Sequence, residues 1–406
     1  MLKVNKNSEA CLRSTQKLFP SDWKITDLKE VAYINMGQSP DSNFYNDIGD
    51  GLPLIQGNAD MKDRNSIQRI FTSQITKVCE KGDFILSVRA PVGSIGIASF
   101  KSCIGRGVCA IKPKNIDSEY LFQLMLHSEA KWKKIEQGST FTAVNSKDVN
   151  DFKLLITSRK SEQIAIAHIL SLMDTAINKN NQLIAKKELQ KKWLMHNLLT
   201  GKKRLKGFNM EWKGVKLESV SNIRRGASPR PIQDPKWFSI KGRGWIRISD
   251  VTKSHFYLNQ TTQYLSDEGA NKSVKVDKGD LIMSICATIG IPVIVNIPAC
   301  IHDGFVLFRD YEKNLTTFFL YYFIQYITDK LSGEGQPGTQ KNLNTSIVGN
   351  INLNLPSIEE QNKIAEVLQL ADKEIQLLKI ISQNLREKKK WLMQVLLTGK
   401  LRINLK

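Results

Sequence analysis

The sequence predicts an α+β fold in which two α/β globules are each followed by one long helix. Three observations support this prediction. The segment KKWLMHNLLTGK at residues 191–202 recurs as KKWLMQVLLTGK at residues 389–400, with ten of twelve positions identical and an offset of 198 residues. The chain has 406 residues, which is more than one hydrophobic core usually serves. Apolar residues make up 41% of it, as is typical of a folded protein.

The internal repeat extends far beyond this segment. Residues 162–202 align with residues 360–400 without a gap, and 18 of the 41 positions are identical. Upstream, FPSDWKITDLKEVAYINMGQSP (19–40) pairs with FNMEWKGVKLESVSNIRRGASP (208–229) at an offset of 189. GDFILSVRAPVG (82–93) pairs with GDLIMSICATIG (279–290) at an offset of 197. The two copies therefore share a frame, while the sequence between the matched segments diverges in length and composition.

Each copy ends in a predicted long helix of about 38 residues. The first helix has apolar residues at helical spacing: Ile166, Ile169, Leu170, Met173, Ala176, Ile177, Leu183, Ile184 and Leu194. The second has a seven-residue column: Ile364, Ala371, Leu378, Leu385 and Leu392. A further column carries Val367 and Ile381 and is interrupted by Glu374. These patterns predict the seam of a coiled coil or of a long bundle helix.

The helix ends carry further signals. Gly201 and Gly399 are predicted left-handed caps that end the helices. Asn180 and Lys187 place polar side chains in the first helix's matching column, where they either fix the register of a buried seam or face solvent. We expect Trp193 and Trp391 to pack in the core or seam. The residues assigned to helix packing or subunit docking are Trp193, Leu194, Leu198, Trp391, Leu392 and Leu396.

The segments that precede the helices have a mixed α/β pattern. Strand-like runs lie at 83–87, 95–98, 280–284, 292–295 and 305–308, and helical runs lie at 119–137 and 316–331. We place the globules at residues 1–157 and 206–357, and the helices at residues 158–205 and 358–406.

Charge is the most informative feature of the composition. There are 59 Lys and Arg against 39 Asp and Glu, which gives a net charge of +20 and favours a polyanionic partner such as nucleic acid. The sequence has no apolar run of about 18 residues and no signal peptide pattern, so no membrane span is expected. The six cysteines form no C-x-x-C pair, which favours reduced thiols in a cytoplasmic protein and no metal site.

The sequence lacks recognisable catalytic motifs. It has no phosphate-binding loop, no amino-methyltransferase motif and no H-E-x-x-H. We interpret the neighbours His302 and Asp303 as structural, because adjacent residues on a strand point to opposite faces. Asp83 and Asp280 each follow a Gly and are expected to be turn residues that open a strand. The sequence therefore predicts no catalytic residue.

As a set, these features resemble the specificity (S) subunit of type I restriction-modification enzymes. The resemblance is carried by the two WLM-x-x-LLTGK helix ends, the two E-Q-x-x-I-A helix starts, the openings at Trp23 and Trp212, and the two Gly-Asp strand starts. It covers nearly the whole chain. It implies two pseudo-symmetric target recognition domains, each reading one half of a split, asymmetric sequence in double-stranded DNA. They would be joined by two long antiparallel coiled-coil helices that set the spacing.

The resemblance also implies partner subunits. Two methyltransferase (M) subunits would dock on the helices, bind S-adenosylmethionine and methylate adenine. Motor-nuclease (R) subunits would add restriction and use ATP and Mg²⁺. The present chain would be a non-catalytic subunit that binds none of these cofactors.

The residues expected to contact DNA are Lys, Arg and polar side chains in the divergent segments. In the first globule they are Arg64, Arg69, Arg89, Lys101, Arg106, Ser139 and Thr140. In the second they are Arg224, Arg225, Arg230, Lys236, Lys241, Arg243, Arg247, Gln336, Thr339, Gln340, Lys341 and Asn342.

Two other functions remain open on the sequence alone. One is a free-standing, sequence-specific DNA-binding protein, which predicts tight binding by the isolated chain. The other is a coiled-coil scaffold, which predicts no salt-dependent binding to DNA.

Overall fold

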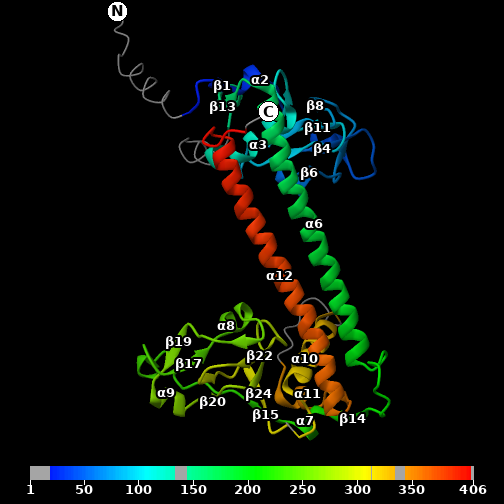
Figure 1. The fold of residues 1–406 in the computed structure, drawn as a ribbon, viewed down its shortest axis with the longest axis vertical. Helices are drawn as coiled ribbons and strands as arrows, with labels where there is room; N and C mark the ends of the chain where they lie inside the picture. Colours follow the sequence, from blue (N-terminus) through cyan, green and yellow to red (C-terminus); the bar gives the residue numbers. More distant parts are fainter. Residues whose placement is uncertain (1–18, 133–143, 312, 334–342, 404–406) are drawn as a thin grey trace, which may run out of the picture. The chain divides into compact units, whose positions relative to one another are not determined.

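The chain folds into two compact units, seen in a computed structural model that describes residues 19–132, 144–311, 313–333 and 343–403 (Figure 1). Unit 1 comprises Met1–Asn181 and Ile380–Lys406, and unit 2 comprises Gln182–Lys379. Two long helices, α6 (Lys160–Leu199) and α12 (Ile358–Leu396), contribute one end to each unit. Their lengths of 40 and 39 residues confirm the predicted long helices.

Unit 1 contains thirteen strands among its described residues, together with short helices. The strands are β1 (Trp23–Asp27), β2 (Ala32–Met36), β3 (Tyr45–Asn46), β4 (Leu52–Ile55), β5 (Met61–Lys62), β6 (Asn65–Ser66), β7 (Phe71–Thr72), β8 (Val78–Cys79), β9 (Phe84–Ser87), β10 (Ile95–Ile97), β11 (Ser102–Ile104), β12 (Val108–Pro113) and β13 (Lys153–Thr157). The helices are α2 (Leu28–Val31), α3 (Ser118–His127), α5 (Ser146–Asn150), η1 (Ser42–Phe44) and η2 (Asn58–Asp60). The helix expected at 119–137 is interrupted by a turn at Ser128, and its last residues lie outside the described part.

Unit 2 is built from the matching set of elements. Its strands are β14 (Lys213–Lys216), β15 (Asn222–Arg225), β16 (Phe238–Ser239), β17 (Arg243–Ile246), β18 (Tyr257–Leu258), β19 (Gln263–Leu265), β20 (Val274–Val276), β21 (Leu281–Ser284), β22 (Pro292–Val295), β23 (Ala299–Ile301), β24 (Phe305–Arg309) and β25 (Asn352–Leu355). Its helices are α7 (Leu217–Val220), η3 (Pro235–Trp237), α8 (Ile248–Lys253), α9 (Asp267–Asn271), α10 (Thr317–Gly333) and α11 (Thr345–Gly349).

The sheets of the two units have the same strand order, except that unit 1 has one additional edge strand, β5. A five-stranded sheet runs β3-β7-β4-β11-β8 in unit 1 and β16-β19-β17-β23-β20 in unit 2. A second sheet runs β2-β12-β9-β10-β6-β5 in unit 1 and β15-β24-β21-β22-β18 in unit 2. A two-stranded ladder pairs β1 with β13 and β14 with β25. The repeat seen in the sequence is therefore a repeat of topology, which confirms two pseudo-symmetric α/β domains.

The register of the paired strands gives a residue-by-residue correspondence between the two units. In unit 1 the parallel ladder of β4 and β11 places Leu54 opposite Cys103 and Ile55 opposite Ile104. In unit 2 the ladder of β17 and β23 places Trp245 opposite Cys300, and Ile246 opposite Ile301. Because Cys103 and Cys300 are also matched by the 197-residue offset, Gln56 and Arg247 occupy the same place in the two frames.

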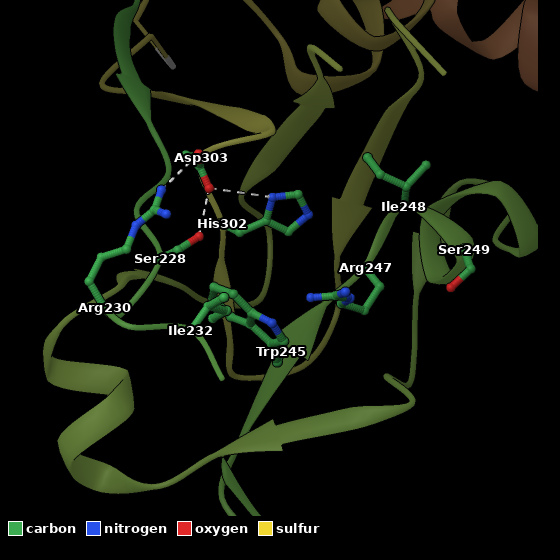
Figure 2. Close-up of a pocket in the computed structure, with 9 residues that line it drawn as sticks. All are labelled: Ser228, Arg230, Ile232, Trp245, Arg247, Ile248, Ser249, His302 and Asp303. Carbon is green, nitrogen blue, oxygen red and sulfur yellow. Dashed lines mark hydrogen bonds and ion pairs between the residues drawn. The ribbon is translucent and has the colours of Figure 1, made fainter. Parts of the chain in front are cut away.

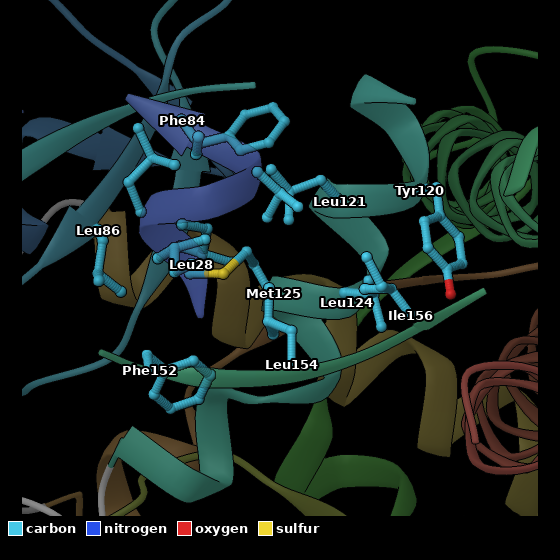
Figure 3. Close-up of a cluster of buried hydrophobic side chains, with 14 of the residues drawn as sticks. Leu28, Phe84, Leu86, Tyr120, Leu121, Leu124, Met125, Phe152, Leu154 and Ile156 are labelled. Carbon is cyan, nitrogen blue, oxygen red and sulfur yellow. The ribbon is translucent and has the colours of Figure 1, made fainter. Parts of the chain in front are cut away.

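Helix α3 packs its apolar side chains against the sheet and forms the core of unit 1 (Figure 3). Leu28, Leu121 and Met125 are completely buried there, and each such side chain contributes roughly 1.5–3 kcal/mol of transfer free energy. Leu396 and Leu397, from the end of α12, belong to the same core. In unit 2 the matching residues Leu198 and Leu199 of α6 join the core under α10. The repeated LLTGK segment is thus a docking element, used once in each unit.

Both helix ends close with the same backbone motif. Gly201 and Gly399 have a φ of +70°, as the sequence predicted. The next turn is fixed by hydrogen bonds from Lys203 N to Asn197 O and from Leu401 N to Val395 O. A side chain at either glycine would meet an aromatic or proline ring, Trp212 in unit 2 and Pro20 in unit 1. The left-handed conformation favours glycine at both positions. The close approach adds to this only at Gly399, where a Cβ would lie 2.8 Å from Pro20, because Trp212 would lie at an ordinary contact distance of 3.4 Å from a Cβ at Gly201.

Within each unit the two helix segments run antiparallel. In unit 1, Asp174 contacts Lys389 at 2.7 Å, and Asn181 contacts Ser382 at 2.8 Å. In unit 2, Lys187 contacts Glu374 at 2.8 Å, and Lys191 contacts Asp372 at 2.7 Å. Residues that come later in α6 contact residues that come earlier in α12, so the segments are antiparallel in both units.

One predicted seam column is correct at Val367, which packs against the core of unit 2, and wrong at Ile381. Ile381 is 46% exposed and Glu374 is exposed, whereas the buried positions lie one residue further on, at Leu368, Ile375 and Ser382. A pattern of apolar residues does not identify Ser382, because serine is polar. Its hydroxyl can nevertheless be buried, because it donates a hydrogen bond to Asn181 Oδ1. The column from Ile364 to Leu392 does face inward, at least in part. Lys187 is partly buried and forms an ion pair with the exposed Glu374 beside the seam.

Candidate nucleic-acid interface

A cavity of about 530 Å³ opens in unit 2 beside the end of β17 (Figure 2). Three chain segments form its wall: the loop after β15, the turn from β17 into α8, and the turn between β23 and β24. Its lining residues are Ser228, Arg230, Ile232, Trp245, Arg247, Ile248, Ser249, His302 and Asp303. The wall thus combines two guanidinium groups, one carboxylate, one imidazole and one indole.

The carboxylate of Asp303 is the anchor of this wall. Its Oδ1 accepts a hydrogen bond from Ser228 Oγ at 2.6 Å, and Arg230 Nη2 lies 3.6 Å from Oδ2. The Ser228 hydroxyl is the main cause that lowers the pKa of Asp303, burial opposes the shift, and the charge of Arg230 adds to it. Asp303 is therefore ionised at neutral pH and remains available as a hydrogen-bond acceptor.

His302 is held in its neutral form. Its Nδ1 accepts a hydrogen bond from Gly304 N at 2.9 Å, which requires an unprotonated nitrogen. Burial lowers the pKa of His302, Arg247 lowers it further, and Asp303 opposes the shift. His302 and Asp303 lie in a turn rather than on a strand, so the predicted opposite orientation is wrong and both side chains line the cavity (Figure 2).

Acidification should therefore destabilise unit 2. An unfolded histidine titrates near pH 6.5, so below that pH the unfolded chain binds more protons than folded His302, whose pKa is lowered. The free energy of unfolding then falls as the pH drops from 7.5 to 5.5. Segment-resolved hydrogen exchange at the two pH values, corrected for the intrinsic rate, measures this loss. The His302→Asn variant should lose less than the wild type, and equal losses would contradict the assignment.

Unit 1 contains a matching cavity of about 610 Å³. Its lining residues are Ser39, Pro40, Asp41, Ser42, Tyr45, Gln56, Gly57, Asn58, Ser87, Arg89, Ala90, Arg106 and Gly107. The loop after β2, the turn after β4 and the turn between β11 and β12 form most of this wall, and these are the equivalents of the unit 2 segments. The two cavities therefore occur at the same place in the two repeated frames.

The residues that sequence reasoning assigned to DNA contact fall into four groups. Four line the cavities: Arg89, Arg106, Arg230 and Arg247. Five form ion pairs within their own unit: Arg64 with Glu129, Arg69 with Asp60, Lys101 with Glu80, Lys236 with Asp234, and Arg243 with Asp277. Arg224, Arg225 and Lys241 are exposed outside the cavities. Ser139, Thr140, Gln336, Thr339, Gln340, Lys341 and Asn342 lie outside the described residues.

Sequence reasoning missed the neutral and acidic members of the two walls. Asp41, Gln56 and Asp303 were not chosen, because the candidates were selected mainly for positive charge. A signal was present in the repeat alignment, since Ser39-Pro40-Asp41 pairs with Ser228-Pro229-Arg230. Asp83 and Asp280 do serve as turn residues, as predicted, because their carboxylates accept from Glu80 N and Asp277 N at 2.8 Å.

The tryptophans of the repeated helix ends are not core residues. Trp193 is 50% exposed and Trp391 is 54% exposed, which contradicts the expected burial. Leu198 and Leu396 are buried, and Leu194 and Leu392 are partly buried, so the leucines supply the packing. Two other matched positions are also exposed on both helices: Leu172 with Leu370, and Leu183 with Ile381.

Two features are absent from the part of the chain that the structure describes. In residues 19–132, 144–311, 313–333 and 343–403, no group of three His, Cys, Asp or Glu side chains is arranged to hold a metal ion. Over the same ranges, none of the helices combines the length and the apolar character needed to cross a membrane.

Comparison with known proteins gives a consistent result. The sequence profile of the family described as "Type I restriction modification DNA specificity domain" matches twice, at residues 20–189 and 209–387. The putative type I restriction enzyme MjaX specificity subunit of Methanocaldococcus jannaschii is 37% identical over 191 residues, which cover 46% of this chain and 45% of that protein. The MjaVIII specificity subunit of the same organism is 27% identical over 312 residues, which cover 72% of each chain.

Solved structures share the fold. A chain from a study of assembly and conformational transition of the type I R-M system matches with a TM-score of 0.65 at 19% identity, covering 94% of this chain and 99% of that one. The S subunit of a type I restriction-modification system from M. genitalium matches with a TM-score of 0.56 at 15% identity, covering 100% and 99%.

Proposed function

This chain belongs to the type I restriction modification DNA specificity family, and on that premise we propose that it is the sequence-reading subunit of a type I restriction-modification complex. Each unit's globule reads one half of a split, asymmetric site in double-stranded DNA. The long helices set the spacing and dock methyltransferase subunits, so that the complex methylates adenine at the chosen site. Motor-nuclease subunits add restriction.

The observation that carries this proposal is the pair of matched cavities. Three equivalent segments form the wall of the cavity in unit 2 and most of the wall in unit 1, and the central strands around the two cavities pair in the same order and register. The residues of the wall nevertheless differ between the units. A protein that presents two identical docking frames and two different polar walls suits an asymmetric split DNA site better than a repeated one.

The charge of the chain supports a DNA partner. The net charge is +20, and the four cavity arginines are all exposed. Guanidinium groups contact phosphates and also bind base edges in the major groove. The chemistry of methylation and restriction is assigned to the partner subunits, which would bind S-adenosylmethionine, ATP and Mg²⁺.

The exposed residues of the long helices support docking of two identical partners. Leu172 and Leu370, Leu183 and Ile381, and Trp193 and Trp391 are three matched pairs of exposed apolar side chains. Each pair is related by the 198-residue repeat, so each helix presents the same three positions. Exposed apolar residues at repeated positions are typical of protein interaction surfaces.

Replacing one exposed tryptophan should remove one methyltransferase subunit. Trp193→Asp and Trp391→Asp should each leave a complex with one such subunit, and the double variant should leave none. The folded chain should be unaffected, because both indoles are about half exposed. Mass photometry of the chain co-purified with its methyltransferase measures the stoichiometry.

The neighbouring lysines provide the matched control. Lys192 and Lys390 are exposed and adjacent to the tryptophans, so Lys192→Asp and Lys390→Asp change the charge of the helix and leave the indoles in place. These variants should keep two methyltransferase subunits. Loss of both subunits from a single tryptophan variant, or no loss from the double variant, would contradict docking at these positions.

A further inference from the structure

Three positions of the two cavity walls carry different polar groups on the same backbone frame. Asp41 in unit 1 corresponds to Arg230 in unit 2, Gln56 to Arg247, and Arg106 to Asp303. At two of the three positions, one unit thus carries a hydrogen-bond acceptor where the other carries a donor. At the third position, an amide in unit 1 corresponds to a guanidinium in unit 2. Residues that only maintained a fold would have no reason to exchange donors for acceptors in this way.

The backbone N–H of Gln56 and that of Arg247 each donate to an aspartate of the helix that follows, four residues on in unit 1 and three residues on in unit 2. Gln56 N donates to Asp60 Oδ2 at 2.8 Å, and Arg247 N donates to Asp250 Oδ2 at 3.0 Å. The preceding residue in each unit is a completely buried isoleucine of the central ladder. The two side chains therefore leave the backbone at equivalent points, and both reach a cavity wall.

Arg106 in unit 1 and Asp303 in unit 2 lie in equivalent turns, and each turn is hydrogen-bonded to the equivalent serine. Arg106 N donates to Ser39 Oγ at 3.1 Å, and Ser228 Oγ donates to Asp303 Oδ1 at 2.6 Å. The same serine position therefore orients the same turn position in both units. It does so through the backbone in unit 1, where the Arg106 side chain is exposed, and through the side chain in unit 2.

Gln56 is oriented before any ligand arrives. The Tyr45 hydroxyl donates its one hydrogen to Pro40 O at 3.1 Å and accepts from Gln56 Nε2 at 2.7 Å. One Nε2 hydrogen and Oε1 are left, and among the residues that the structure describes they have no recorded partner. A remaining N–H donor beside a C=O acceptor matches the N7 and N6 edge of adenine.

Arg247 has the complementary chemistry for a different base. Its side chain is exposed, and within the described part of the chain its guanidinium has no recorded hydrogen bond or ion pair. Two parallel guanidinium N–H donors match the O6 and N7 acceptors of guanine. His302 beside it is neutral and does not compete as a cation.

We propose that Gln56 and Arg247 are matched specificity-determining residues, and that Gln56 reads an adenine in one half-site and Arg247 a guanine in the other. Positions 41/230 and 106/303 flank them and select the neighbouring base pairs. This inference rests on the proposed function, and it names the residues by which each half-site is recognised.

The test uses the complete chain assembled with its methyltransferase subunits. Methylation rates are measured on duplexes that carry the mapped motif and differ at one base pair. Gln56→Ala should reduce the preference at one base pair of one half-site by about 10- to 100-fold, and Arg247→Ala should do the same in the other half-site. In each variant the opposite half-site should keep its preferences.

The exchange variants sharpen the test and guard against misfolding. Gln56→Arg and Arg247→Gln each introduce a side chain that the other frame already carries. Gln56→Arg should move the preferred base from adenine toward guanine at the affected position, and Arg247→Gln should do the reverse. Lys81→Ala and Lys272→Ala, which alter exposed lysines outside the cavities, should leave every preference unchanged.

The outcomes separate the inference from the proposed function. A wild-type complex that methylates no split motif would overturn the proposed function, and the inference with it. A split motif whose preferences are unchanged in all four cavity variants would overturn the inference alone. A single variant that reduces the base preference equally in both half-sites would also overturn the inference, because each cavity is assigned to one half-site.

Discussion

Arg402→Met should destabilise unit 1 by about 3 kcal/mol and leave unit 2 at its wild-type stability. Arg402 Nε and Nη2 contact the Glu162 carboxylate at 2.6 and 3.0 Å, and Glu162 is only 1% exposed. Asp22 binds the same guanidinium at 2.8 Å. Removing the guanidinium leaves the buried carboxylate of Glu162 with the Thr157 hydroxyl as its recorded partner. Hydrogen exchange resolved by segment measures the loss.

The repeat supplies the matched control. Arg204 Nε and Nη2 hold Glu360 at 2.7 Å in unit 2, and Trp212 Nε1 adds a bond at 3.1 Å. Arg204→Met should therefore weaken unit 2 and spare unit 1. Equal loss of protection in both units from either variant would show that the units do not unfold separately. Unchanged protection in unit 1 of Arg402→Met would contradict the role of the ion pair.

The double variant Arg230→Glu/Arg247→Glu should weaken binding of the assembled complex to its DNA site by at least about 100-fold. Both guanidiniums line the cavity of unit 2, and reversing them places two carboxylates beside Asp303. The slope of log affinity against log salt concentration should also become shallower, because fewer phosphates are neutralised. Fluorescence anisotropy across a salt series measures both quantities.

The control for this variant keeps the change in net charge and moves it away from the cavity. Lys272 and Lys278 are exposed residues of unit 2 that do not line the cavity. Lys272→Glu/Lys278→Glu should weaken binding far less. Equal weakening by the two double variants would show that net charge, rather than the cavity, determines the affinity.

The sequence was sufficient to predict the elements that depend on local pattern and on the repeat. The long helices, the glycine caps and strands such as β9 and β21 each combine an apolar period with a nearby turn signal. The seam was harder to predict, because the buried hydroxyl of Ser382 is hydrogen-bonded to Asn181, which lies 201 positions away in the sequence. No local pattern contains that information, so Ile381 was chosen in its place.

The cavities could be predicted only in part. Arg230 and Arg247 were chosen for their charge, and the structure brings them to one wall. Asp303 joins them from the turn between β23 and β24, which lies more than fifty residues further along the chain. That juxtaposition follows from the parallel pairing of β17 with β23, a pairing that no spacing in the sequence reveals. Trp193 and Trp391 were misjudged because large aromatic residues are usually buried.

The most direct test of the central claim is to map methyladenine across a genome in cells that express the methyltransferase subunit with and without this chain. We expect a split, asymmetric motif that is present with the chain and absent without it. Methylation that is unchanged when the chain is omitted, together with no complex between the two proteins, would contradict the specificity-subunit function. A salt titration of DNA binding by the chain alone would then distinguish a free-standing DNA-binding protein from a scaffold.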